Sequence, residues 1–243
     1  MSRGFYALGS GILTQNRTLD TISNNIANSN TIGFKKDKVL TTSFGDMVVS
    51  RLDSQTTALG NVSMINTVGE TATDYSQGML KNTGRTLDFA IQGEGFFAVQ
   101  TDNGMVYTRN GSLNIDSDGY LSLNGVGHVM GTNGPIKLGT DDITADSSGK
   151  IYVDNKQVNQ LAIYNFNNYA NLENMGQGTF NAANPILQAD ANLIWQSVEN
   201  SNVDAAEEMT NMISAQRELQ SCSQAMKMYD TIMGKAATEI GKL

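Results

Sequence analysis

Residues 205–240 read AAEEMTNMISAQRELQSCSQAMKMYDTIMGKAATEI, and this stretch decides what kind of fold the chain can have. Neither Gly nor Pro interrupts it before Gly234, so its spacing predicts one helix from about residue 203 to 240. At 1.5 Å per residue such a helix is roughly 55 Å long, longer than a small domain is wide. We therefore expect it to find partners outside a compact core. Its larger apolar residues recur every seven positions: Met212, Leu219, Met226, Met233 and Ile240.

A second row of residues at the same spacing completes the seam of this helix. It contains Ala215, Cys222, Tyr229 and Ala236, and Glu208 is its one charged member. A helix that keeps a seven-residue apolar repeat packs along that seam against another helix. Asn202 or Ser201 can cap its first turn.

The other end of the chain carries a shorter seam of the same kind. With Gln15, its apolar residues step by three and four without a break: Phe5, Leu8, Ile12, Leu19, Ile22 and Ile26. Gly4, Gly9 and Gly11 weaken the first turns, because Gly costs up to about 1 kcal/mol in a helix interior. The run Asn28-Ser29-Asn30, followed by Gly33, ends the helix. Residues 1–30 and 205–243 are therefore predicted to form one discontinuous, coiled-coil-like helical domain.

The middle of the chain has the pattern of antiparallel β structure. Asp116-Ser117-Asp118-Gly119 precedes the alternating Tyr120–Leu123, and Asp146-Ser147-Ser148-Gly149 precedes Lys150–Val153. Each repeat places Asp and Gly where a tight turn needs them and follows them with a period-two strand. Leu87–Val99 and Gln160–Phe166 are further expected strands. We predict an α+β fold with a central, mainly antiparallel β domain over 76–189, joined to the helices by extended or β connectors at 31–75 and 190–204.

Composition excludes several classes of partner. The net charge of −8 over 243 residues leaves no global basic field for nucleic acid. No stretch approaches the ~18–20 apolar residues of a membrane span. The N-terminus leads into an amphipathic segment instead of the apolar core of a signal peptide. We expect either a cytoplasmic protein or one that leaves the cell by a route without a cleaved leader.

The residues needed for catalysis or metal binding are scarce. A single histidine, His128, and a single cysteine, Cys222, cannot build a His/Cys metal cluster. Gly93-Glu94-Gly95 lacks the further Gly and following helix of a dinucleotide site. His128 is expected in a surface loop, and Lys35-Lys36-Asp37-Lys38 is expected as a solvated connector. The sequence thus predicts a non-enzymatic protein without cofactor or metal.

Four groups of residues, in order along the chain, resemble the flagellar axial protein family of rod, hook and hook-associated subunits. The first runs from Ser23-Asn24-Asn25-Ile26-Ala27-Asn28 to Thr31-Ile32-Gly33-Phe34-Lys35 and matches the N-terminal signature of that family without departure. Ser76-Gln77-Gly78 and the run Gly93-Glu94-Gly95-Phe96-Phe97 with Tyr107-Thr108-Arg109-Asn110-Gly111 resemble the core of rod and hook subunits. Glu199-Asn200-Ser201-Asn202 with Glu208-Met209 resembles the C-terminal motif.

The resemblance implies a structural subunit of the basal-body rod. Terminal helices would line an axial tube that transmits torque and forms the export channel, and the β domain would decorate its outside. The partners would be further copies, other rod or axial proteins and, during secretion, the flagellar export apparatus. The implied location is the basal body outside the cytoplasmic membrane, after export without a cleaved signal. The expected assembly interface comprises Phe5, Leu8, Ile12, Leu19, Ile22, Asn24, Asn25, Ile26, Asn28, Gly33, Phe34, Met212, Leu219, Met226, Tyr229, Met233 and Ile240.

Chain length and one local motif distinguish among the members of the family. Two other classes of protein remain as alternative interpretations of the sequence. A modest β insert resembles the mid-sized proximal and distal rod proteins more than the hook subunits. Gly127-His128-Val129-Met130-Gly131 followed by Gly134-Pro135-Ile136 favours the proximal one. A secreted adhesin or phage-tail-like β protein with helical ends is the main alternative from another class. A polysaccharide-acting enzyme is the second, and it would need a cleft with paired carboxylates.

Overall fold

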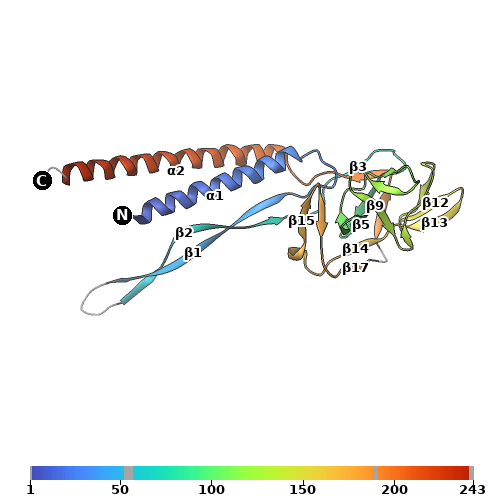
Figure 1. The fold of residues 1–243 in the computed structure, drawn as a ribbon, viewed down its shortest axis with the longest axis horizontal. Helices are drawn as coiled ribbons and strands as arrows, with labels where there is room; N and C mark the ends of the chain where they lie inside the picture. The colour runs from blue at the N-terminus through green and yellow to red at the C-terminus, as the bar shows by residue number, and fades with distance from the viewer. Residues whose placement is uncertain (1, 52–56, 189–190, 241–243) are drawn as a thin grey trace. The chain divides into compact units, whose positions relative to one another are not determined.

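Two α-helices at the chain ends and a series of short strands make up the described part of the chain (Figure 1). The computed structural model describes residues 2–51, 57–188 and 191–240. Helix α1 spans Ser2–Ala27 and helix α2 spans Ala205–Ile240. The strands between them pair in antiparallel fashion, so the predicted α+β class is confirmed.

The chain divides into two compact units that differ from the predicted domains. The helical unit contains Met1–Ala27, Asp37–Thr73 and Asp204–Leu243. The β unit contains Asn28–Lys36 and Asp74–Val203. Residues 37–73, which the sequence predicted as part of a connector, thus belong with the helices.

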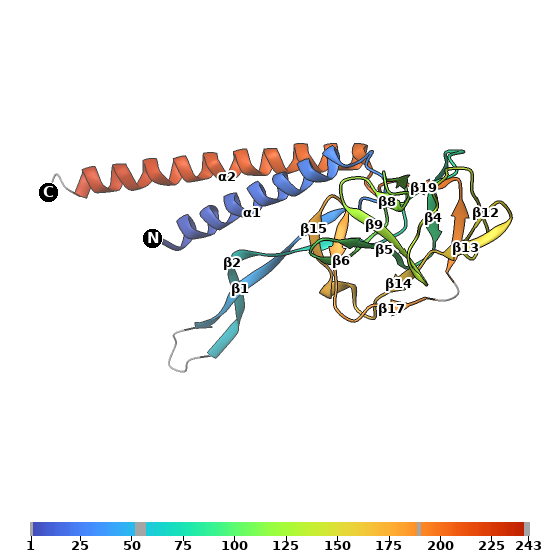
Figure 2. The ribbon, with the colours of Figure 1, turned by 45° about the vertical axis from the view of Figure 1, so that its right-hand side comes forward.

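Strands β1 (Asp37–Arg51) and β2 (Thr57–Thr73) pair as a long antiparallel hairpin. Its base is fixed where Asp37 faces Thr73, whose hydroxyl donates a hydrogen bond to the Asp37 carboxylate at 2.6 Å. Helix α1 contacts both strands as well as α2, and Figures 1 and 2 show the two helices side by side. The Thr- and Val-rich composition suits strands. Bulges interrupt the pairing after Val39 and after Val49, which explains why the sequence lacks a clean period of two.

The main sheet of the β unit is built around strand β5. Its strands run in the order β15-β16-β6-β5-β9-β8-β7, with β10 beside β9, β14 beside β5 and β17 beside β14. Strands β11, β12 and β13 form a separate sheet, and β18 pairs with β4 as β19 pairs with β3. The bounds are β3 Leu80–Asn82, β4 Phe89–Gln92, β5 Phe96–Thr101, β6 Gly104–Thr108, β7 Asn114–Ile115, β8 Leu121–Leu123, β9 Gly127–Gly131, β10 Gly134–Pro135, β11 Thr144–Ala145, β12 Lys150–Val153, β13 Lys156–Gln160, β14 Ile163–Asn165, the 3₁₀ turn Tyr169–Asn171, β15 Glu173–Gly176, β16 Thr179–Asn181, β17 Ile186–Leu187, β18 Asn192–Trp195 and β19 Ser197–Glu199.

Strand β5 is buried on both faces and separates two groups of core side chains. Phe97 and Val99 pack into a mainly aliphatic cluster with residues of β4, β8, β9, β12 and β18. Phe96 and Ala98 point to the other face, where they join an aromatic cluster with Tyr107 and others. Successive side chains of a strand alternate between faces, so one apolar run supplies both clusters.

The two Asp–Gly turns predicted from the sequence are confirmed and share one geometry. The Asp116 carboxylate accepts hydrogen bonds from the backbone N–H groups of Asp118 and Tyr120, and Asp146 accepts from Ser148 and Lys150 in the same way. The backbone bond from Tyr120 lowers the pKa of Asp116 below its ordinary value. His128 lies on strand β9 with Nε2 2.8 Å from Asp116 and its ring stacked on Tyr120, so its expected placement in a loop was wrong.

Strands β18 and β19, which follow the predicted end of the β domain at residue 189, contribute side chains to the core of the β unit. Leu193 of β18 and Val198 of β19 are both buried, and Leu193 belongs to the aliphatic cluster. Trp195 donates its indole N–H to the carbonyl of Thr86 at 2.7 Å. Residues 76–189 therefore omit part of the core of the compact unit.

Candidate functional site

Helices α1 and α2 pair in antiparallel fashion with a constant register. The position of Gly4 lies against the Tyr229 ring, that of Gly11 lies against Cys222 Sγ, and Gln15 donates a hydrogen bond to Glu218. Each step forward along α1, of seven and then four residues, is matched by an equal step backward along α2. A Cβ added at Gly4 or Gly11 would meet the Tyr229 ring at 3.5 Å or the Cys222 sulfur at 3.7 Å, which is ordinary van der Waals contact.

A buried polar contact fixes the C-terminal end of α1 against the start of α2. Asn25 is 1% exposed, and its amide donates to the Glu208 carboxylate at 3.2 Å and to the carbonyl of Asp37 at 2.9 Å. Its side-chain oxygen accepts from the N–H of Asp37 at 3.0 Å. The pair Asn25 and Glu208 continues the same register, ten residues beyond Gln15 and Glu218. A buried polar pair of this kind favours one register, because a shift of α1 along α2 would break the hydrogen bond between Asn25 and Glu208.

The residues predicted for the assembly interface occupy different environments. Ile22 is 7% exposed, and Gly33 and Phe34 are buried in the β unit. The side chain of Ile240 lies outside the described residues. Asn24 and Phe5 are exposed, and the rest are half-buried: Leu8, Ile12, Leu19, Ile26, Asn28, Met212, Leu219, Met226, Tyr229 and Met233.

Large apolar side chains that the sequence analysis did not select lie open on both helices. Tyr6 and Leu13 of α1 are each 65% exposed and stand seven residues apart. On α2, Met209 and Ile213 are exposed near its start, as are Met228 and Ile232 nearer its end. They fall outside the predicted seams, because their helix faces carry too few apolar residues to form a repeat. Within the described chain they leave apolar surface that another helix can cover.

The β unit contains a buried ionic cluster of Lys35, Arg109 and Glu199. Lys35 Nζ lies 2.5 Å from Glu199 Oε1, and Arg109 Nη1 lies 3.1 Å from Glu199 Oε2. All three side chains are at most 3% exposed. Arg109 also lies over the Phe96 ring, 5.1 Å from its centre. Buried charges of this kind persist only when paired, so each cation depends on the one carboxylate.

This cluster overturns the expectation that residues 35–38 are a solvated connector. Lys35 is 1% exposed, and its ammonium also donates to the carbonyl of Ser76 at 2.7 Å. Burial lowers the pKa of Lys35 below its ordinary value, while the Glu199 carboxylate opposes that shift. A run of three lysines around one aspartate looked solvated because the sequence does not show that Glu199 lies beside the first.

The four family-like motifs meet at Glu199. Its carboxylate accepts from the N–H of Gly78 at 2.8 Å in addition to the two cations, and its carbonyl accepts from the N–H of Gly33 at 2.8 Å. Asn202 accepts from the N–H of Lys36 and donates to the carbonyls of Asp74 and Ser76. Segments far apart in sequence are therefore tied together where the chain enters and leaves the β unit.

Gly33 offers a test of how tightly these segments fit. Its φ is +71°, and an added Cβ would lie 2.4 Å from the backbone nitrogen of Asn110. Gly84 has nearly the same φ of +73° but open space around it. We expect Gly84→Ala to cost about 1 kcal/mol from backbone strain and Gly33→Ala to cost at least about 2 kcal/mol more. Urea unfolding of both variants measures the difference, and equal losses would show that the contact with Asn110 is unimportant.

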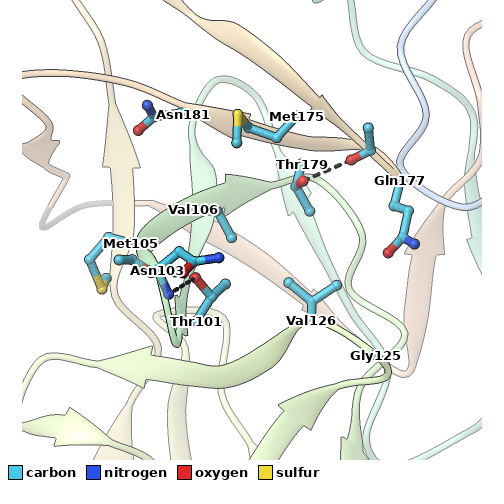
Figure 3. A pocket seen from close by; sticks show the side chains of 12 residues that line it. Thr101, Asn103, Met105, Val106, Gly125, Val126, Met175, Gln177, Thr179 and Asn181 are labelled. Atoms are coloured by element: carbon cyan, nitrogen blue, oxygen red, sulfur yellow. Dashed lines mark hydrogen bonds between the residues drawn. The ribbon is translucent and has the colours of Figure 1, made fainter.

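An open groove on the β unit offers no acid or base. It has a volume of about 430 Å³, and Figure 3 shows its walls formed by the turns around Asn103, Val126 and Gln177. Its described lining consists of Thr, Asn, Gln, Gly, Met and Val residues, without an ionisable side chain. Over residues 2–51, 57–188 and 191–240, no cluster of His, Cys, Asp and Glu residues suited to a metal ion occurs. In those same ranges no helix has the length and apolarity needed to span a membrane.

Comparison with known proteins agrees with the motifs. Residues 5–35 match the flagella basal body rod protein family, 90–153 match the flagellar hook protein FlgE/F/G D1 domain, and 196–239 match the flagellar basal body rod FlgEFG protein C-terminal family. The chain is 34% identical to the flagellar basal-body rod protein FlgG of Bacillus subtilis, with 96% of this chain and 97% of that protein covered. The chain belongs to the flagellar basal-body rod protein family. It is also 30% identical to the rod protein FlgF of Mesorhizobium japonicum, with 99% of each chain covered.

The family matches at the two ends of the chain cover most of the helix pair and part of the buried ionic cluster. The chain is a structural subunit of the flagellar basal body, and the rod-family match at residues 5–35 covers both α1 and Lys35. The C-terminal family match begins at residue 196, so it takes in Glu199, Asn202 and α2. The matched ends therefore include the helix pair and two of the three residues of the ionic cluster.

Proposed function

We propose that this rod subunit polymerises through its terminal helices into an axial tube that transmits torque and encloses the export channel. The observation that carries the proposal is the helix pair itself. Its constant register holds α1 on α2, while Tyr6, Leu13, Met209, Ile213, Met228 and Ile232 stay uncovered. Each such side chain contributes roughly 1.5–3 kcal/mol when a partner helix buries it. Several contacts per subunit offset the cost of ordering the helices.

The partners in this proposal are further copies of the chain and the other rod and axial proteins. Packing of the exposed residues of α1 on those of α2 in the next copy, without the reciprocal contact, is heterologous and can continue into a helical assembly. The seven-residue repeat of α2 supports coiled-coil packing between subunits. Export through the flagellar apparatus without a cleaved signal accords with an N-terminal helix weakened by Gly4, Gly9 and Gly11.

We also propose that this subunit occupies the proximal part of the rod. The modest β insert favours the two mid-sized rod proteins over the hook, and Gly127–Gly131 followed by Gly134-Pro135-Ile136 favours the proximal over the distal rod. Identities of 34% to an FlgG and 30% to an FlgF are too close to separate these subunits. A density map that resolves the axial layers of a basal body assigns the position directly.

Purified basal bodies provide the test of the proposed function. A short epitope inserted in the exposed turn between Asn124 and Gly125 marks the subunit on its β unit and leaves the sequence of both helices unchanged. We expect the epitope on the rod in electron micrographs, and we expect a strain lacking the gene to be non-motile with incomplete rods. An epitope spread over the cell surface, with normal rods in the deletion strain, would instead identify an adhesin-like protein.

A further inference from the structure

The hydrogen bonds at the two ends of the β unit connect its first segment to its last. Gly33 donates to the carbonyl of Glu199, and Lys36 donates from its backbone to Asn202 at 2.8 Å. Asn200 donates to the carbonyl of Met79 at 2.9 Å, which adds the segment that follows the long hairpin. We call this set of segments, 33–36, 74–79 and 199–202 with Arg109, the clasp.

The clasp holds a cluster of buried charges, whereas the core beside it is mainly apolar. Two rings of the clasp are also packed: Phe34 is buried, and Tyr75 lies on Phe96 of the aromatic cluster. Three ionised side chains are buried in the clasp with one net positive charge, and Arg109 Nε has no hydrogen-bond partner. Desolvation of such groups offsets much of their attraction. Desolvated charges and a buried donor without an acceptor make a region less stable than a packed apolar core, and the less stable regions of a protein open first. Strand β5, in contrast, is buried by apolar clusters on both faces.

We propose that the clasp is a separate cooperative unit that opens and closes as one while the β core stays folded. Glu199 couples its parts, since its carboxylate and carbonyl together receive donors from Gly33, Lys35, Gly78 and Arg109. Loss of the carboxylate removes an acceptor from Lys35, Gly78 and Arg109 at once and weakens the connection between the first and last segments. The subunit thereby has a built-in joint where the chain enters and leaves the β unit.

Native-state hydrogen exchange on the full-length monomer tests this joint. Four amides report on the clasp because their acceptors lie within it: Gly33, Lys36, Gly78 and Asn200. We expect these four to share one protection factor, at least tenfold below that of Val99 in the core. Lys35→Met removes one cation and should raise all four exchange rates by a common factor of ten or more, with Val99 remaining at least tenfold better protected than the four.

Two further variants keep the result interpretable. Lys81→Met makes the same change at an exposed position of β3 and should leave all five rates unchanged. Asn202→Ala removes bonds to Lys36, Asp74 and Ser76 without removing a charge, and should also raise the four rates together. Four rates that change independently, or four amides that are as well protected as Val99 in the wild type, would overturn the proposal. The experiment needs no assembly, so its failure would leave the proposed rod function untouched.

Discussion

A subunit with Ile22→Asp is expected to be absent from rods, and the cells that carry it are expected to be non-motile. Ile22 is buried on α1, so the change removes roughly 1.5–3 kcal/mol of apolar burial and adds the cost of desolvating a carboxylate. The helix pair should come apart, whereas the β unit keeps its own core. Swimming in soft agar and electron microscopy of basal bodies measure the effect, and near-ultraviolet circular dichroism reports on the β unit.

Asn16→Asp is the matched control for this prediction. It adds the same charge to an exposed position of the same helix and should leave motility normal. Leu219→Asp on α2 should reproduce the loss, because Leu219 belongs to the seven-residue repeat that faces a partner. Motility with intact rods in Ile22→Asp cells would show that the α1 seam is not required for assembly.

The second large effect is expected at Glu199. Glu199→Ala leaves Lys35 and Arg109 buried with no carboxylate, and loss of one partner from a buried ion pair costs about 3–5 kcal/mol. The free energy of unfolding of the β unit should fall by that amount. Fluorescence of Trp195, the single tryptophan, follows urea unfolding because this residue lies on β18 beside the aliphatic cluster.

An exposed carboxylate provides the comparison for Glu199. Glu173 lies on β15, and Glu173→Ala should change the free energy of unfolding by less than about 0.5 kcal/mol. A midpoint of urea unfolding for Glu199→Ala that equals those of the wild type and Glu173→Ala would refute the role of the cluster.

Local sequence patterns were enough to predict the two terminal helices and the two Asp–Gly turns. The seven-residue repeat from Met212 to Ile240 needed only the period of an α-helix, and α2 ends where that repeat ends. Asp116 and Asp146 cap their own turns through bonds to residues two and four positions ahead. Interactions of such short range are encoded in adjacent residues, and they were therefore predictable.

The long hairpin and the buried cluster depend on partners far away in sequence. Strands β1 and β2 lack regular alternation, so their pairing and their contact with α1 could not be inferred from either segment alone. Lys35 was misjudged because a lysine beside other charges is normally solvated. Its partner Glu199 stands 164 residues further along the chain.

The sequence by itself determined the two terminal helices, the β middle and the family, because each of these depends on short-range periodicity or on motifs. Only the tertiary structure decided which polar residues are buried. Glu208 in the helix pair and Glu199 in the clasp both became internal acceptors. The reason is that the free energy of a buried charge depends on whether its partner reaches it, and only the folded chain brings that partner within hydrogen-bond distance.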